Sequence, residues 1–430
     1  MPPPEMPENL EVTETPGLRG LPRVDSQPAV FTISSYEQAR EVFRQKDLRQ
    51  ALYDAGEVVM ADVLVNLHGD DHRARRRLEN RLFRKDTHLR YERELFPPLL
   101  EATLAPAVLA GRGELVTLSH QIMMNLAALT AGVDRPAGTP EETLRLYAYL
   151  MTFIEGATLA HYSGDVAAKE AQVTQALKEF DQEFLQPSIA RRTALLKDLE
   201  GNRITEADLP QDVLTTLLRN QDQLELPRDV LLREVCFFLL AGAHTSATAF
   251  LRTLDQIFAY TDSQPELAER AKTDPIFLQR CVHETIRLNP SSPVAMRWAV
   301  QDLVLSDGTQ VAAGDKVIID LMAANRDPQV FGETAGQFQP ERSPDRGVAP
   351  WGLSFGLGMH ACIGQDLAAG VDPTGLPPEA EHLLGLVPAT VSAVLLAGGR
   401  PDPDAPAKLD PLSARNYWSE YPVLFGDGAP

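Results

Sequence analysis

Cysteine is scarce in this sequence, because its 430 residues contain only Cys236, Cys281 and Cys362, and no two of these form a CxxC pair. So small and odd a number excludes a disulfide framework and a zinc ribbon. Neither a GxGxxG fingerprint nor a phosphate-binding P-loop occurs. We interpret Cys236 and Cys281, which lie among apolar neighbours, as buried packing residues.

Basic residues are also few, since 40 lysines and arginines face 60 acidic residues and the formal net charge is −20. This balance argues against nucleic acid or an anionic membrane as a main partner. The longest apolar run, VCFFLLAGA at 235–243, is shorter than the roughly 18 residues that a membrane span needs. The N-terminus has no basic segment followed by an apolar one, as a secretory signal would. We therefore expect a soluble, cytoplasmic protein.

Helical periodicity dominates the chain from about residue 35 to 290. Residues 228–260 read as one long helix that is apolar at its centre, and such a helix should run through the middle of a large domain. Residues 299–321 instead contain short strand-like runs separated by turns such as Asp307-Gly308. The sequence therefore predicts a mainly α fold with a small β-rich part, an α+β class.

Cys362 lies in FGLGMHACIG (355–364), a loop in which Gly356, Gly358 and Gly364 allow positive φ and close approach to a flat group. A helix that starts at Gln365 would stabilise a thiolate through its dipole and free N–H groups. A nucleophile would need a general base, and His360 is poorly placed for that role. One cysteine cannot form a zinc or iron–sulfur site. The local residues leave a haem with one axial thiolate and a buried, unreactive thiol equally open.

This loop closely resembles the haem-binding loop F-x-x-G-x-H-x-C-x-G of bacterial cytochromes P-450. The matching residues are Phe355, Gly358, His360, Cys362 and Gly364. The resemblance implies haem b with Cys362 as its proximal thiolate, Phe355 beside the sulfur and His360 near a propionate. It also implies that Gly356 and Gly364 contact the cofactor.

HETIRL (283–288) provides the Glu-x-x-Arg pair that this resemblance predicts, with Glu284 and Arg287 on one helical face. Such a pair is usually a solvated surface bridge that contributes little. In the family the pair is buried and joined by a second arginine, for which Arg342 in QPERSPD matches. We therefore expect Glu284, Arg287 and Arg342 to form a structural cluster behind the haem, with no chemical role.

LLAGAHTSAT (239–248) resembles the family's distal-helix motif at Ala241, Gly242 and Thr245. A core helix with a tolerated glycine is the alternative. The resemblance implies that the helix opens locally to admit dioxygen, and that Thr245 helps to deliver protons. His244 occupies the position where an acid is usual. It either replaces that acid as a proton shuttle, since its reference pKa is near 6.5, or contacts substrate or packs elsewhere.

Residues 68–85 carry His72 and Arg76, which match the family's H-x-x-x-R, and Arg297 matches a further basic position. The resemblance implies that all three bind the haem propionates. Seven basic residues lie between Arg73 and Lys85. The others among them form either a solvated helix face or a docking patch for an acidic ferredoxin.

The sequence after Cys362 departs from the family, which continues a long helix here. Asp372-Pro373 and Pro377-Pro378 should break that helix. We expect an inserted stretch at 371–386 on or near the proximal side, where it would affect partner docking.

Taken together, the resemblance implies a cytochrome P-450 fold, with haem between the long distal helix and the helix after Cys362. We expect a proline- and acid-rich arm at 1–30 and a single haem domain at 31–430. The expected activity is insertion of one atom of O2 into a C–H bond, with electrons from ferredoxin and ferredoxin reductase or equivalent proteins. A peroxide-driven peroxygenase, a non-catalytic haem sensor or ligand-binding protein, and a thiol enzyme without haem are the alternatives.

The substrate itself is not readable from the sequence. Four segments resemble places where the family builds its substrate pocket: 53–66, 147–165, 291–296 and 416–422. Their apolar content predicts a small and mainly apolar molecule.

Overall fold

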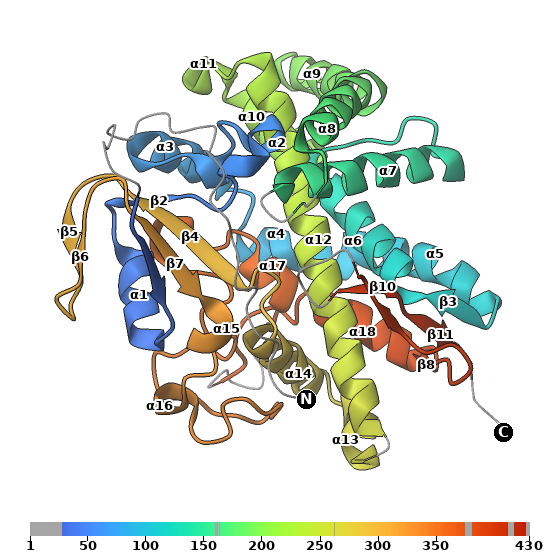
Figure 1. Ribbon diagram of the computed structural model, residues 1–430. Helices are drawn as coiled ribbons and strands as arrows, with labels where there is room; N and C mark the ends of the chain where they lie inside the picture. Colours follow the sequence, from blue (N-terminus) through green and yellow to red (C-terminus); the bar gives the residue numbers. More distant parts are fainter. Residues whose placement is uncertain are drawn as a thin grey trace.

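The computed structural model describes residues 28–159, 162, 164–261, 263–374, 381–411 and 417–426 (Figure 1). Most of the predicted arm at 1–30 lies outside these residues. Strand β1 begins at Val30, which is the last residue of that arm, and pairs in parallel with β7.

Helices account for most of the described chain, as the sequence predicts. They are α1 (Tyr36–Arg44), α2 (Glu57–Met60), α3 (Gly69–Glu79), α4 (Lys85–Arg90), α5 (Phe96–Leu109), α6 (Leu115–Ala131), α7 (Pro140–Ala157), α8 (Val166–Phe180), α9 (Gln186–Glu200), α10 (Val213–Arg219), α11 (Gln221–Leu224), α12 (Arg228–Thr261), α13 (Pro265–Thr273), α14 (Pro275–Leu288), α15 (Leu321–Ala324), α16 (Pro328–Phe331), α17 (Gln365–Ala369) and α18 (Leu386–Leu396). Shorter helical segments include the 3-10 helices η2 (Leu64–Asn66) and η7 (Gly358–His360) and the π-helix η3 (Tyr91–Leu95).

Helix α12 is the predicted long helix, and its 34 residues cross the whole molecule (Figure 1). By length and composition it could span a membrane, but 72% of its apolar window is buried inside the protein. It packs on α6, α7, α14 and α18, and its side chains belong to the main hydrophobic core. The helix is therefore the apolar centre of the fold, and Cys236 and Cys281 are buried in the same core, as predicted.

The described residues form four small sheets outside this helical body. Their strands are β1 (Val30–Ile33), β2 (Leu48–Gln50), β3 (Arg112–Glu114), β4 (Val294–Ala299), β5 (Leu303–Val304), β6 (Gln310–Val311), β7 (Lys316–Asp320), β8 (Arg400–Pro401), β9 (Lys408–Leu409), β10 (Trp418–Glu420) and β11 (Pro422–Leu424). The largest sheet has the order β1-β7-β4-β2, and a second has the order β3-β11-β8. The predicted turn at Asp307-Gly308 joins the hairpin β5–β6, with Gly308 at φ +89°.

Helix α3 is joined to α12 by buried charged groups. Arg75 Nη1 donates to Glu234 Oε2 at 2.5 Å, and the backbone N–H of Leu64 donates to both oxygens of the same carboxylate. Glu79 is fully buried and its carboxyl group contacts that of Glu234. Arg75 therefore does not belong to the exposed basic face that its sequence position suggests. The exposed basic residues of this segment are Arg73, Arg77, Arg81, Arg84 and Lys85.

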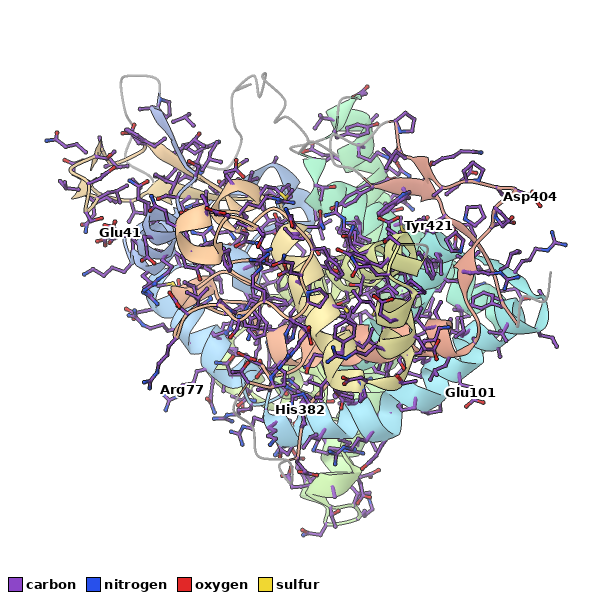
Figure 2. The ribbon with its side chains drawn as sticks, turned by 90° about the horizontal axis from the view of Figure 1, so that it is seen from below. Glu41, Arg77, Glu101, His382, Asp404 and Tyr421 are labelled. Carbon is purple, nitrogen blue, oxygen red and sulfur yellow. The ribbon has the colours of Figure 1, made fainter. Side chains whose placement is uncertain are left out.

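Helix α17 is only five residues long and ends at Gly370, whose φ is +73°. The chain then leaves the helix, as predicted, and returns at Gly385, where α18 follows. Residues 375–380 of the predicted inserted stretch lie outside the described residues. The described residues 371–374 and 381–385, which we call the excursion, include His382, labelled in the view from below in Figure 2.

Candidate functional site

The loop before α17 is shaped by backbone hydrogen bonds and glycines. The N–H of Cys362 donates to Phe355 O at 2.8 Å. Gly356 and Gly358 have φ of +64° and +69°, and a Cβ on Gly358 would lie 2.5 Å from Phe43 O. These two positions therefore require glycine. Gly364 differs from the prediction, because its φ is −94° and a Cβ there would meet no protein atom within 4 Å.

Cys362 lies at the N-terminal end of α17, as the sequence predicts. Its side chain is accessible from one side, although protein atoms crowd it on the others, and this burial raises the pKa of the thiol. The N–H groups of Gly364 and Gln365 and the guanidinium of Arg76 oppose that effect. An accessible sulfur that faces free N–H groups and a cation suits a thiolate ligand for a metal.

Five basic side chains from three parts of the chain surround this loop. They are His68, His72, Arg76, Arg297 and His360. The rings of His72 and His360 lie 4.5 Å apart, and Arg76 Nη2 donates to Ala361 O at 2.8 Å. Arg297, on β4, donates to Gln50 Oε1 at 2.6 Å. The structure thus brings together all four basic residues that the resemblance assigned to the propionates, and adds His68, which the H-x-x-x-R pattern does not contain.

This cluster lacks anionic partners within the described part of the chain. None of its members forms an ion pair with a carboxylate there, and both ring nitrogens of His72 and of His360 are buried without a hydrogen-bond partner. Burial and the nearby cations lower the pKa of His360 to about 2 and that of His72 to about 4. A dianionic group would supply the missing acceptors and the missing negative charge. The residues present therefore fit a haem whose propionates contact this cluster and whose iron contacts Cys362.

Glu284 lies between the two arginines that the resemblance named. Arg287 donates to both its carboxylate oxygens at 2.7 Å, and Arg342 Nε donates to Oε1 at 3.1 Å. Arg287 is fully buried and also donates to Asn325 O and Ala335 O. Asn325, which the sequence analysis missed, donates to Arg287 O and accepts from the N–H of Leu353. The cluster is thus joined to the segment that precedes the Cys362 loop.

The distal motif lies midway along α12. Gly242 and Thr245 are exposed although the helix runs through the core, and Thr245 Oγ1 donates to Ala241 O at 2.8 Å. Helix α12 runs without interruption through these residues, and the local opening stays a prediction. Gly242 has a packing reason, since a Cβ there would lie 3.2 Å from Ala127 Cβ on α6.

His244 points away from this exposed face. Its ring lies 5.8 Å from that of His120, nearly parallel, and 5.8 Å from that of Tyr417, nearly perpendicular. All three line a cavity of about 300 Å³ between α6, α7, α12 and β10. Met151 and Trp418 line it as well, so two of the four predicted pocket segments meet here, whereas 53–66 and 291–296 do not line it.

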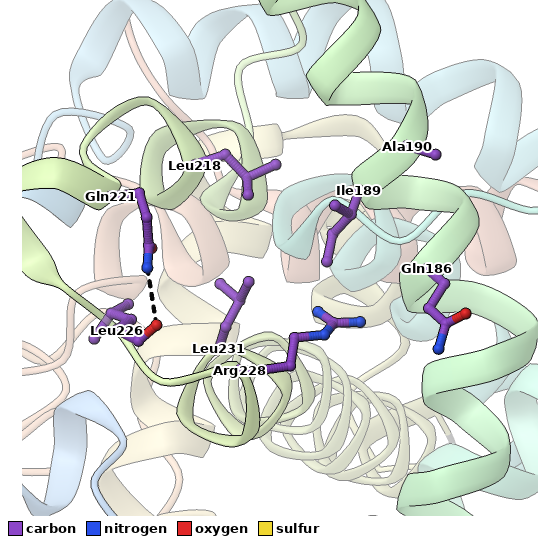
Figure 3. A pocket seen from close by; sticks show the side chains of 8 residues that line it. All are labelled: Gln186, Ile189, Ala190, Leu218, Gln221, Leu226, Arg228 and Leu231. Atoms are coloured by element: carbon purple, nitrogen blue, oxygen red, sulfur yellow. Dashed lines mark hydrogen bonds between the residues drawn. The ribbon is translucent and has the colours of Figure 1, made fainter.

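A second cavity, of about 410 Å³, lies between α9, α10, α11 and the start of α12 (Figure 3). It is lined mainly by apolar side chains, with Arg228 at one side and a hydrogen bond from Gln221 Nε2 to Leu226 O at the other. Its lining contains no residue of the Cys362 loop or of the distal motif.

The family model for cytochrome P-450 matches residues 166–369, which include the distal motif, the Glu284 cluster and Cys362. Residues 166–369 therefore belong to a cytochrome P-450 domain. Solved cytochromes P-450 share the fold of this chain over nearly all of its length. CalO2 covers 96% of this chain and 94% of its own at 20% identity, with a TM-score of 0.68. P450BioI, solved with a fatty-acid-carrying acyl carrier protein, covers 92% of each chain at 18% identity, with a TM-score of 0.69.

Curated cytochromes P-450 match over shorter stretches. The family protein EryCII of Saccharopolyspora erythraea is 34% identical over 165 residues, which are 38% of this chain and 41% of that protein. Vitamin D(3) 25-hydroxylase of Pseudonocardia autotrophica is 30% identical over 176 residues, 40% of each. The chain spans only 16% of a self-sufficient cytochrome P-450 monooxygenase of Phanerodontia chrysosporium and 40% of cytochrome P-450 86B1 of Arabidopsis thaliana. It thus spans less than half the length of these relatives.

Proposed function

We propose that this cytochrome P-450 is a haem-thiolate monooxygenase that inserts one atom of O2 into a C–H bond of a small organic molecule. The observation that carries the proposal is the position of Cys362. Its sulfur is accessible at the start of α17, beside a cluster of basic side chains that has no carboxylate partner within the described residues. When bound, the haem would supply the oxidation chemistry, and the electron-rich thiolate would favour O–O cleavage.

The side chains of this protein would bind the cofactor and control protons around it. Cys362 would hold the iron, and His72, Arg76, Arg297 and His360 would bind the propionates. Phe355, Gly356 and Gly364 would contact the cofactor near the sulfur. Glu284, Arg287 and Arg342 would act only on the shape of the proximal side.

Three residues of the distal motif would face the reaction: half-buried Ala241 and exposed Gly242 and Thr245. Thr245 Oγ1 donates to Ala241 O, so its lone pairs remain available to hold a water or a proton donor. His244 would act on the neighbouring cavity, either by moving protons or by contacting substrate. That cavity supports a small substrate, because its walls are largely apolar or aromatic.

Electrons would come from separate proteins, a ferredoxin and its reductase or equivalents. The exposed basic residues between Arg73 and Lys85 support an acidic electron donor. The chain as a whole is strongly acidic and would repel such a donor elsewhere, so this basic face is where it would dock. We also propose that the protein is soluble and cytoplasmic, and that neither nucleic acid nor a membrane is a partner.

Replacing Cys362 by serine tests the proposal. We expect the unchanged protein to bind haem and to show a red-shifted absorption band when reduced and treated with carbon monoxide, and Cys362→Ser to lose that shift. An unchanged protein without haem, or with haem held by imidazole, would refute the proposal. Product formation with peroxide but not with a ferredoxin system would select a peroxygenase, and ligand binding without turnover would select a sensor.

A further inference from the structure

Helix α17 begins three residues after Cys362 and is too short to be stabilised by its own backbone hydrogen bonds. Its five residues leave the carbonyl groups of its last turn without intrahelical partners. Gln279, one turn before His283 on α14, lies where these carbonyls and those of the excursion converge. Its Nε2 lies within hydrogen-bond distance of four backbone oxygens: Ala369 at 3.1 Å, Val371 at 3.1 Å, Leu383 at 3.2 Å and Leu384 at 3.0 Å.

This arrangement joins both ends of the excursion at one side chain. Gln279 is completely buried, and its Oε1 accepts a hydrogen bond from His382 Nε2 at 2.7 Å. Gly370 and Gly385 allow the two ends to approach, because both have positive φ and a Cβ on either would collide with the backbone of the other end. The amide of Gln279 thus replaces the helical turns that α17 lacks.

His283 connects the same helix end to the Cys362 loop. Its Nε2–H donates to Ala369 O at 2.8 Å, and the centre of its ring lies 4.9 Å from that of Trp351, with the two rings nearly perpendicular. The ring centres of Trp351 and Phe355 lie 5.7 Å apart, and the carbonyl oxygen of Phe355 accepts a hydrogen bond from the N–H of Cys362. One buried histidine therefore contacts elements on both sides of the cysteine.

The far end of the excursion is held by η3. The carboxylate of Glu92 accepts from the N–H groups of Leu384 and Gly385, at 3.3 and 2.6 Å, and Arg93 pairs with Glu381 at 2.6 Å. The excursion is thus hydrogen-bonded to α14 on one side and to η3 on the other.

We propose that Gln279 and His283 are positioning residues for Cys362, and that the excursion holds α17 in place of the missing helical turns. The inference rests on the proposed function, because it concerns the geometry of the proposed iron ligand. Neither residue contacts the thiol itself; both act through Ala369, Trp351 and Phe355.

The test uses Gln279→Leu and His283→Leu, which keep side-chain volume but remove the donors, and His283→Gln, which keeps an N–H donor. Losing a buried hydrogen bond that leaves carbonyls unsatisfied should speed amide hydrogen exchange at 362–371 by about tenfold or more. In the reduced, carbon-monoxide-treated protein, we expect both leucine variants to lose a large part of the red-shifted band, and His283→Gln to recover part of it.

Leu150→Ala is the control, because Leu150 is fully buried on α7, away from this loop. It should destabilise the protein without changing the band or the exchange at 362–371. The inference would be overturned if both leucine variants kept the wild-type absorption band and the wild-type amide exchange rates at 362–371. It would also be overturned if Leu150→Ala lost as much of the absorption band as the leucine variants do. Wild-type protein without a red-shifted band would refute the proposed function instead, while exchange in the haem-free chain would still decide whether these residues hold α17.

Discussion

Arg287 is the largest fully buried side chain among the described residues, and its charge is balanced by a single carboxylate, that of Glu284. Glu284 accepts two hydrogen bonds from it, one from Arg342 and one from the N–H of Gln339. A buried ion pair of this kind contributes little relative to an apolar core, but removing one partner leaves an uncompensated charge.

We expect Glu284→Gln to lower the free energy of unfolding by roughly 3–5 kcal/mol, because it leaves the Arg287 charge buried without a counter-ion. Denaturant titration of the purified variant measures this. Glu341→Gln is the control, since Glu341 pairs with Arg270 at the surface and its loss should change stability very little. Equal stability of Glu284→Gln and wild type would contradict the assignment.

Residues whose role follows from local spacing could be predicted from the sequence. Glu284 and Arg287 share a helix face, and Cys362 precedes a helix start, so both features follow from near neighbours. His244 could not be placed in this way, because the rings of His120 and Tyr417 come from distant segments. Asn325 has no local signal either, since its partners are Arg287 O and the Leu353 N–H.

At the scale of elements, the contact of α3 with α12 depends on one proton that the carboxyl groups of Glu79 and Glu234 share. Glu79 and Glu234 contact each other in the core, and Glu234 is satisfied by Arg75 and the N–H of Leu64. Neither oxygen of Glu79 accepts a hydrogen bond within the described residues, as expected for a protonated acid that donates to Glu234. Burial, then the neighbouring carboxylate, raise the pKa of Glu79 well above its usual range, and burial raises the pKa of Glu234 to about 6.

These shifts predict how stability changes with pH. Because both pKa values are higher in the folded protein than in the unfolded chain, the folded state binds more protons, and stability falls as pH rises from about 4.5 through the folded pKa values. We expect Glu79→Gln, which can donate but cannot ionise, to weaken that fall by up to about 1.4 kcal/mol per pH unit. Urea unfolding from pH 5 to 8 measures it, and parallel pH profiles would contradict the shared proton.

The elements themselves could be predicted to different degrees. The long apolar pattern of 228–260 and the Asp307-Gly308 turn indicated α12 and the β5–β6 hairpin from sequence alone. The strands β1, β2 and β3 were not predicted, because each has only three or four residues and its partner is remote in the chain. Arg75 faces α12 rather than solvent, which the run of basic residues conceals.

At the scale of the whole molecule, the proposed haem site depends on residues between His68 and Cys362, which the fold brings together. Haem binding should therefore stabilise the complete fold. At a haem concentration 100 times the dissociation constant, the expected gain is about 3 kcal/mol, or several degrees in melting temperature. Calorimetry with and without haem measures this.

Arg297→Leu should reduce the gain, because Arg297 is buried in the basic cluster and would lose its propionate contact. Arg73→Leu is the matched control, because Arg73 is exposed, and it should leave the gain in stability from haem unchanged. A melting temperature that does not respond to haem would contradict the site.

The strand β11 has a consequence for how the chain is made. It pairs with β3, more than 300 residues earlier in the chain. Next to it, the backbone N–H of Tyr421 donates to Glu114 and the hydroxyl of Tyr421 donates to Asp255. A nascent polypeptide on the ribosome cannot complete this sheet until residue 424 has emerged. All residues up to 424 must therefore be synthesised before this sheet can close, and until then the apolar sides of α6 and α12 are within reach of chaperones.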